Sequence, residues 1–246
     1  MAEERKPIRA CLFDMDGLLI NSEDIYTEVT NSVLSDHGKP NLPWHIKADL
    51  QGRPGTEATR RFLEWSELPY SPEELYAEMS RRQESKWATT QAMPGAQELL
   101  EKLQAAEVPF ALASSSHKAN YELKTAHLDD MFDKFGIHKV LGDDTRIPKG
   151  RGKPAPDIWL VALASLNQDL LASGKISAPI EADECLVFED GIPGIQGAKE
   201  AGCQIVWVPH PKILEIFEND KLEIVGTKGE ILESLHEFDG KKYGME

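Results

Sequence analysis

The chain has 246 residues, of which 41% are hydrophobic, and it carries a formal net charge of −15. This length and apolar content predict one large domain, or a core domain with an insertion, around a sizeable hydrophobic core. The strong negative charge argues against a nucleic-acid polymer or an anionic membrane as partner, because both are bound mainly through basic surfaces.

The cysteines and the termini point to a reducing compartment. Cys11, Cys185 and Cys203 lie in or beside apolar runs, and their spacing matches neither a metal motif nor a disulfide framework. We expect buried free thiols. Residues 1–6 precede no apolar segment of secretory length, and no stretch approaches the length of a membrane span. The chain is therefore predicted to be soluble, cytoplasmic and monomeric, with a dimer left open.

The first predicted element is a buried strand over residues 8–13 that ends in two carboxylates, Asp14 and Asp16, and then Gly17. Alternate residues of an extended chain point to the same side, so both acids could face one ligand. Two like charges this close cost energy unless a metal, a proton or hydrogen bonds compensate them. From this stretch alone, a solvated acidic turn is as good an interpretation as a ligand site.

Residues 22–92 show helical patterns throughout and no strand signal. Ser22 is placed to cap a first helix, and Ser71 opens a capping box for a later one. We expect an inserted all-helical cap domain over residues 22–92, which would lie above the carboxyl end of the first strand. The core domain would then comprise residues 1–21 and 93–246.

After Pro94 the pattern changes to strands that alternate with helices. This alternation predicts a parallel sheet with helices on both faces. A last edge strand is expected at 222–225 and a final short helix at 229–235. The other predicted strands are the apolar runs at 109–113, 137–141, 185–188 and 204–208.

Polar groups of a consistent kind follow four of the predicted strands. The carboxyl ends of parallel strands meet at one edge of a sheet, so these groups should lie together. Their carboxylates suit Mg²⁺, while a hydroxyl and a lysine suit phosphate oxygens. Such a site could bind a small anion despite the net charge. The groups are Asp14 and Asp16, Ser114, Lys153, and Glu189 with Asp190.

These motifs, in this order and over nearly the whole chain, resemble those of the haloacid dehalogenase superfamily, in its phosphatase branch with a helical cap. The resemblance implies an α/β fold with a Rossmann-like three-layer parallel-sheet core and an inserted all-helical cap domain. It also implies that Asp14 is a nucleophile that forms an aspartyl-phosphate and that Asp16 is the general acid and base. The motifs are Asp14-Met15-Asp16-Gly17, Ser114, Gly152-Lys153-Pro154 and Phe188-Glu189-Asp190.

The resemblance further implies two sets of binding residues, one for the substrate phosphate and one for Mg²⁺. Ser115 would contribute a backbone N–H, while Ser116 is expected to cap the following helix. Glu189 is either a direct metal ligand or a partner of one. The residues expected to bind the substrate phosphate are Ser114, Ser115 and Lys153. Those expected to hold Mg²⁺ are Asp14, Asp16 (through its backbone carbonyl), Glu189 and Asp190.

The implied reaction is hydrolysis of a small phosphorylated metabolite, with pseudouridine 5′-phosphate as the first candidate. A sugar or polyol phosphate, such as 2-deoxyglucose 6-phosphate or glycerol phosphate, is the alternative, because substrate choice in this branch comes mainly from the cap. Isomerases of the β-phosphoglucomutase type share the core and the cap. They carry a histidine at the position aligned with Tyr26 and an arginine at that aligned with Gly55, so hydrolysis is favoured here. A pseudo-enzyme that binds a ligand without catalysis is disfavoured, because Asp14, Asp16, Lys153 and Asp190 are all present.

Overall fold

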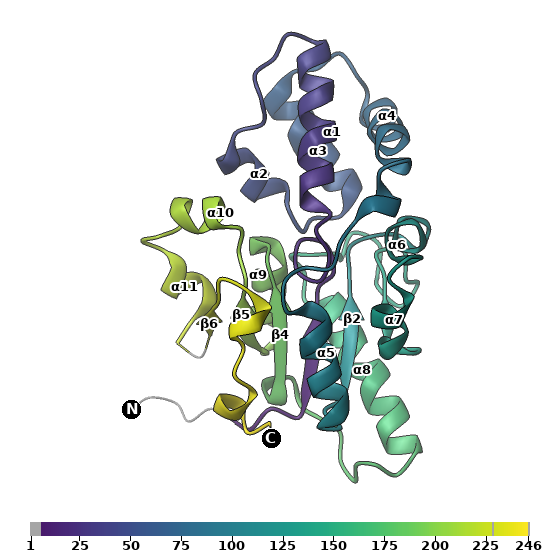
Figure 1. Ribbon diagram of the computed structural model, residues 1–246, viewed down its shortest axis with the longest axis vertical. Coiled ribbons are helices and arrows are strands. Elements are labelled where there is room, and N and C mark those ends of the chain that lie inside the picture. The colour runs from purple at the N-terminus through teal and green to yellow at the C-terminus, as the bar shows by residue number, and fades with distance from the viewer. Residues whose placement is uncertain (1–5, 228, 246) are drawn as a thin grey trace.

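A six-stranded parallel sheet forms the centre of the computed structural model, which describes residues 6–227 and 229–245. The strand order is β3-β2-β1-β4-β5-β6, so β1 lies between β2 and β4 (Figure 1). Most of the charged segment 1–6 lies outside the described residues. The strands are β1 (Ala10–Phe13), β2 (Phe110–Ala113), β3 (Lys139–Val140), β4 (Cys185–Glu189), β5 (Gln204–Trp207) and β6 (Glu230–Ile231).

The strands read as continuous apolar runs because helices cover both faces of the sheet. Every residue of β1, β2, β4 and β5 is buried. On one face, Phe13 stacks on Phe188 at 4.6 Å between ring centroids, beneath α5 (Ala96–Ala105) and α7 (Asp129–Phe132). On the other face, α8 (Asp157–Ala172) and α9 (Ile192–Ala201) pack on the alternate residues.

Four helices and a short 3-10 turn separate β1 from the rest of the core and lie above the carboxyl ends of the strands (Figure 1). We call this unit the cap. It has a small apolar centre of its own, which includes Val33, Phe62 and Leu75. The predicted fold class is confirmed, while the exact domain limits stay a prediction. The elements of the cap are α1 (Glu23–Asp36), α2 (Trp44–Leu50), α3 (Gly55–Ser66), α4 (Pro72–Glu84) and η1 (Trp87–Thr89).

Two expectations near the carboxyl terminus are wrong. Residues 222–225, predicted as an edge strand, belong to helix α11 (Lys221–Val225), which buries Val225 and leaves Leu222 exposed. The edge position belongs instead to β6, which pairs with Val206 and Trp207 inside the segment predicted as a helix. Periodicity cannot separate a strand from a helical turn in such short segments, so packing decides.

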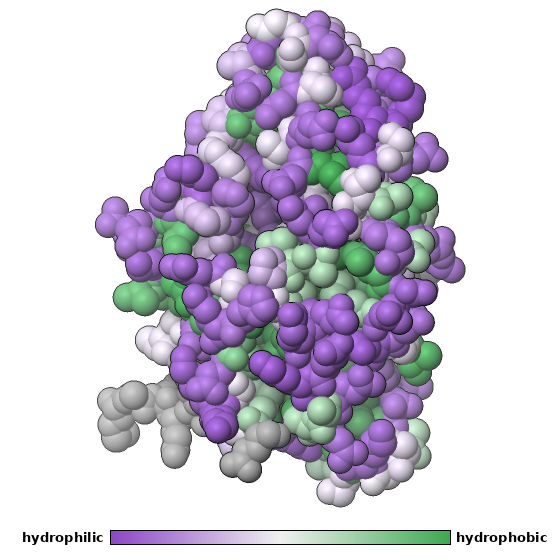
Figure 2. Space-filling view, viewed as in Figure 1, coloured by the Kyte–Doolittle hydropathy of each residue, from purple (hydrophilic) through white to green (hydrophobic). Residues whose placement is uncertain are grey.

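The remaining described elements connect these layers. Helix α6 (Lys118–Thr125) follows β2, and α10 (Pro211–Ile216) follows β5. Hydrophilic side chains cover most of the visible face of both cap and core in Figure 2. No helix within the described ranges has the length and apolarity needed to cross a membrane. The other 3-10 turns are η2 (Asp133–Phe135), η3 (Ala182–Glu184), η4 (Leu235–Glu237) and η5 (Gly240–Tyr243).

Candidate active site

The residues that follow β1, β2 and β4 meet at one edge of the sheet, below the cap. Asp14 continues β1, and its backbone N–H donates to the Phe188 carbonyl at 3.1 Å, which keeps the two strand ends side by side. The structure brings the predicted residues to this edge, where most of their side chains are almost entirely buried and those of Asp16 and Ser115 are partly buried. The buried members are Asp14, Ser114, Lys153, Glu189 and Asp190.

Three carboxylates form a compact acidic cluster at this edge. Asp14, Glu189 and Asp190 each offer an oxygen, and these oxygens lie within 4.8 Å of one another. Lys153 forms ion pairs with Asp14 and with Glu189 Oε2, the latter at 2.8 Å. Burial, and next the charge of Glu189, raise the pKa of both Asp14 and Asp190 well above the ordinary value. One ammonium is therefore too little positive charge for three buried carboxylates.

The cluster has the donor set of a hard divalent cation. Asp190 Oδ1 is buried and accepts no hydrogen bond from any described residue. Carboxylate oxygens of this kind are the ligands that Mg²⁺ prefers. Gly17 has a φ of +86°, and a Cβ at that position would collide with the Asp190 carboxylate. The glycine thus lets the chain turn tightly around this group, and the residues present fit a bound metal ion.

Asp16 lies apart from this cluster, in a different network. Its Oδ1 accepts hydrogen bonds from Ser22 Oγ and Lys124 Nζ, both at 2.6 Å, and its Oδ2 accepts from Ser116 Oγ at 2.7 Å. Ser114 Oγ lies 3.4 Å from the same Oδ2. Burial alone would raise the pKa of Asp16, but the Lys124 ammonium and these hydrogen bonds outweigh it and hold the pKa below its ordinary value.

This network overturns two sequence expectations. Ser22 does occupy the N-cap position of α1, but its side chain makes no cap hydrogen bond there and turns to Asp16 instead. Ser116 does not cap α6, because His117 is the N-cap residue and the Ser116 hydroxyl donates to Asp16. In both cases the Asp16 carboxylate outcompetes the backbone N–H groups of the helix start for the hydroxyl.

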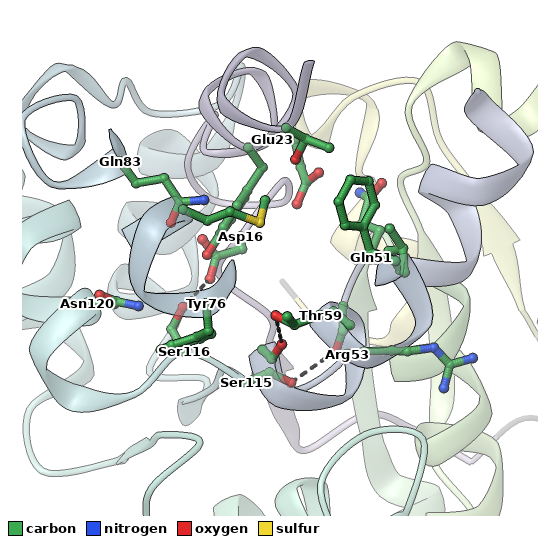
Figure 3. Close-up of a pocket in the computed structure, with 18 of the residues that line it drawn as sticks. Asp16, Glu23, Gln51, Arg53, Thr59, Tyr76, Gln83, Ser115, Ser116 and Asn120 are labelled. Carbon is green, nitrogen blue, oxygen red and sulfur yellow. Dashed lines mark hydrogen bonds between the residues drawn. The ribbon is translucent and has the colours of Figure 1, made fainter. Parts of the chain in front are cut away.

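Two further contacts join the cap to this edge of the sheet. Ser115 Oγ donates to the Gly52 carbonyl at 3.0 Å, as the dashed line in Figure 3 shows. Gln51 Nε2 donates to Asp190 Oδ2. The sequence did not reveal Gln51, which lies in what reads as an ordinary loop, nor Lys124, which belongs to no recognised motif. A buried position for either side chain depends on contacts with residues far along the chain.

A pocket opens between the cap and the sheet edge. Asp14 and Asp16 line its floor, and the cap supplies a wall in which apolar side chains such as Phe62 and Met79 lie beside uncharged polar ones. In the same pocket Lys47 pairs with Glu23 at 3.2 Å, which offers both signs of charge to a ligand. Gln83, Thr59 and Ser115 converge on this space in Figure 3. The uncharged polar residues that the cap contributes to the lining include Thr27, Thr30, Thr59, Ser80 and Gln83.

Comparisons with known proteins agree with this geometry. Residues 8–202 match the family model of the haloacid dehalogenase-like hydrolases. A probable pseudouridine-5′-phosphatase of Saccharomyces cerevisiae is 46% identical, over 97% of this chain and 98% of its own length. A (DL)-glycerol-3-phosphatase of Arabidopsis thaliana is 33% identical, over 98% of this chain and 93% of its own. The solved β-phosphoglucomutase of Clostridium difficile has the same fold, with a TM-score of 0.71 at 22% identity and 96% and 97% coverage of the two chains.

Proposed function

Because the chain belongs, as its motifs predict, to the haloacid dehalogenase-like hydrolases, we propose that it is a cytoplasmic, magnesium-dependent phosphatase for a small phosphorylated metabolite. One observation carries the proposal. Asp14 lies buried beside Lys153 and the acidic cluster, while a second carboxyl, Asp16, faces the same pocket within a separate set of donors. Two carboxyls in unlike surroundings suit two unlike roles.

In the proposed mechanism, Asp14 is the nucleophile. One of its carboxylate oxygens attacks the phosphorus atom, and the bond from phosphorus to the ester oxygen breaks, which leaves an aspartyl-phosphate and a free alcohol. Lys153, paired with Asp14, holds its ammonium where the phosphoryl oxygens would lie and stabilises their charge. Ser114 and the backbone N–H of Ser115 complete the phosphate site at the end of β2.

Asp16 moves the proton in both steps. The negative charge of a phosphate ester bound beside Asp16 favours its protonated form against the effect of Lys124, so Asp16 takes up a proton and, as a carboxylic acid, gives it to the departing alcohol oxygen. As a carboxylate it then takes a proton from the water that attacks the aspartyl-phosphate, and the bond from phosphorus to the Asp14 oxygen breaks to release phosphate. The position two residues after Asp14 places it in the same pocket without joining the acidic cluster. Each transfer returns the carboxyl to the state that the next one needs.

Mg²⁺ is the proposed cofactor, held by Asp14, Asp190 and the Asp16 backbone carbonyl, with Glu189 as a ligand or as the partner that orients Lys153. When bound, such an ion shields the negative charge of the nucleophile from that of the phosphate. Asp190 Oδ1 supports this assignment, since it finds no donor in the part of the chain that the structure describes and a buried carboxylate oxygen without a donor is costly.

The first candidate substrate is pseudouridine 5′-phosphate. The yeast relative named for this activity spans nearly the whole chain, cap included. Threonine, serine and glutamine side chains in the cap wall could bond to ribose hydroxyls and to the edge of a base. Glycerol 3-phosphate is the second candidate, because the Arabidopsis relative also aligns over the cap and the same hydroxyls suit a polyol.

Phosphate release from a panel of esters tests the proposal. The panel holds pseudouridine 5′-phosphate, nucleoside monophosphates, sugar phosphates including 2-deoxyglucose 6-phosphate, and glycerol 3-phosphate, each with and without Mg²⁺. We expect release from at least one ester, dependent on Mg²⁺ and absent in Asp14→Asn. Isomerised sugar phosphate without phosphate release would identify a mutase instead. Release that survives chelation or Asp14→Asn would refute the mechanism.

A further inference from the structure

A completely buried lysine, Lys124, lies beside Asp16 and takes no part in the mechanism described so far. It belongs to α6, on the core side of the pocket. Lysine side chains are almost never fully buried unless they are paired, because the charge loses its hydration. The contacts that compensate this burial show what the residue could do.

The Lys124 ammonium donates three hydrogen bonds. Nζ donates to Asp16 Oδ1 at 2.6 Å, to the Tyr26 hydroxyl at 2.8 Å and to Ser116 Oγ at 3.0 Å. An ammonium has three N–H donors, so each has an acceptor. Nζ also lies 4.8 Å from the centre of the Tyr26 ring and 4.5 Å from that of Trp87, where cation–π attraction adds to the pairing.

These partners come from both parts of the molecule. Tyr26 lies in the first turn of α1, just after the chain enters the cap, and Trp87 lies in η1, just before the chain leaves it. The two rings pack edge to face at 5.1 Å. Asp16 and Ser116, by contrast, belong to the core side. The ammonium is therefore the point at which both cap connections meet the carboxyl of Asp16.

We propose that Lys124 is a positioning residue that orients the Asp16 carboxyl for proton transfer and, through Tyr26, ties this orientation to the position of the cap. The inference rests on the proposed function, in which Asp16 is the general acid and base. A displacement of α1 would carry the Tyr26 hydroxyl and ring with it and change the geometry around the ammonium. A misplacement of about 1 Å in such a group can cost about 100-fold in rate.

The first test compares Lys124→Met and Lys124→Arg with the wild type, on the alkyl phosphate of the panel that the wild type cleaves fastest and at saturating Mg²⁺. For Lys124→Met we expect kcat to fall about 100-fold, the lower range of a general acid–base contribution, with KM changed by less than about threefold. Lys124→Arg should recover at least about tenfold of this loss, because it restores a donor and a charge. Lys118→Met, an exposed lysine of the same helix, is the matched control and should leave both constants unchanged.

The second test separates positioning of Asp16 from a general loss of structure. With 4-nitrophenyl phosphate the leaving group departs without a proton, so the first turnover does not need the acid. In Lys124→Met we expect the first-turnover release of nitrophenolate to stay within about threefold of the wild type, while steady-state turnover falls about 100-fold. In an Asp16→Asn background, Lys124→Met should lower the steady-state rate by less than about a further twofold.

The third test concerns the link to the cap. Tyr26→Phe keeps the ring over the ammonium and removes the hydroxyl, and we expect kcat to fall about tenfold, as for the loss of one hydrogen bond to a charged group. In a Lys124→Met background the same change should have less than about twofold effect, because the hydroxyl acts through the ammonium. Equal effects in both backgrounds would overturn the cap link.

Failure of this inference and failure of the proposed function give different results. Phosphate release by the wild type but not by Asp14→Asn would support the proposed function. If Lys124→Met then keeps the wild-type kcat, or if its first-turnover and steady-state rates fall equally, the positioning role is wrong and the proposed phosphatase activity stands. If Lys124→Met does not fold, the Tyr26→Phe and Lys124→Arg variants give the same readouts. If no ester is cleaved by the wild type, the proposed function fails and this inference with it.

Discussion

The core edge and the cap meet across one pocket but are stabilised in different ways. At the core edge, charged side chains are almost fully buried and contact one another, as Lys153 contacts Asp14 and Glu189. In the cap, apart from the Lys47–Glu23 pair in the pocket, charged side chains pair along the outer surface of helices, as Glu78 does with Arg81 and Arg82. Burial makes the first set costly to alter. Exposure makes the second set tolerant of change.

This difference indicates that the core edge and the cap have separate roles. The sheet edge presents a fixed arrangement of carboxylates and an ammonium, which suits a reaction common to a whole family. The cap has a small apolar centre around Leu75 and a pocket wall of mixed polar and apolar side chains, which can be exchanged without disturbing that arrangement. Loss of a group at the edge should therefore abolish the chemistry, whereas changes in the cap should have smaller and more local effects.

The largest effect is expected for Asp14→Asn. An amide cannot attack phosphorus as a carboxylate does, so kcat/KM should fall by at least about 10⁴-fold. The fold should survive, because Lys153 keeps its partner Glu189. Phosphate-release kinetics and the midpoint of thermal unfolding measure the two properties. Asp130→Asn, on the exposed surface of α7, is the control. Retained activity in Asp14→Asn would show that Asp14 is not the nucleophile.

Removal of the metal should rank next. Dialysis against a chelator should lower activity about 10³-fold, and Mg²⁺ should restore it, since the ion offsets the charge of the buried carboxylates. Calorimetric titration of Mg²⁺ gives a readout that does not depend on turnover. Asp190→Asn should weaken that binding at least about tenfold. Equal Mg²⁺ affinity in this variant and the wild type would contradict the placement of the metal in the cluster.

The two apolar centres offer a direct comparison of stability. Leu112 of β2 and Leu75 of α4 are both completely buried, and each replacement by alanine should cost about 2–5 kcal/mol. Leu112→Ala should lower the free energy of unfolding of the core. Leu75→Ala should mainly speed hydrogen exchange in α1, α3 and α4, because local opening of the cap leaves the sheet packed. Faster exchange in β1 and β4 as well would show that cap and core unfold as one unit.

The sequence predicted the parts of the molecule that repeat a strong pattern. Four strands of the sheet appear as apolar runs, and the capping box at Ser71 forms as expected, with Glu74 N–H donating to Ser71 Oγ at 3.2 Å. The strand predicted at 222–225 is wrong because four residues can bury one side chain equally well as a strand or as a helical turn. The family prediction is confirmed, since it rested on four motifs spread over the whole core.

The site could be predicted only where a motif marks its residues. Asp14, Lys153 and Asp190 stand in such motifs, and the fold brings them together. Lys124 stands in none, and a lone lysine on a helix is ordinarily exposed, so its burial against Asp16 could not be foreseen. Ser22 was assigned to the nearest backbone because local capping is the common outcome, whereas the deciding partner is a buried carboxylate.

The smallest effect is expected in the partly exposed ion pairs of the cap. Hydrogen bonds from Arg81, and next from Arg82, lower the pKa of Glu78 to about 2, compared with about 4.3 for an unfolded chain. A carboxyl whose pKa is lower in the folded state adds stability above the unfolded pKa and loses it as the pH falls toward the folded one. Glu78→Gln should thus destabilise the cap by about 0.5 kcal/mol at pH 7, and the difference should shrink steadily between pH 4 and pH 2.

Hydrogen exchange of cap amides at a series of pH values, corrected for intrinsic rates, measures this difference between Glu78→Gln and the wild type. High salt should reduce it at pH 7, because the pair is near the surface and is screened. Glu84→Gln, an exposed residue of the same helix, is the matched control and should differ from the wild type by less than Glu78→Gln at every pH. A Glu78→Gln difference that is as large at pH 3 as at pH 7 would mean that the amide acts through packing, and the cap would then resemble the core edge in depending on buried contacts.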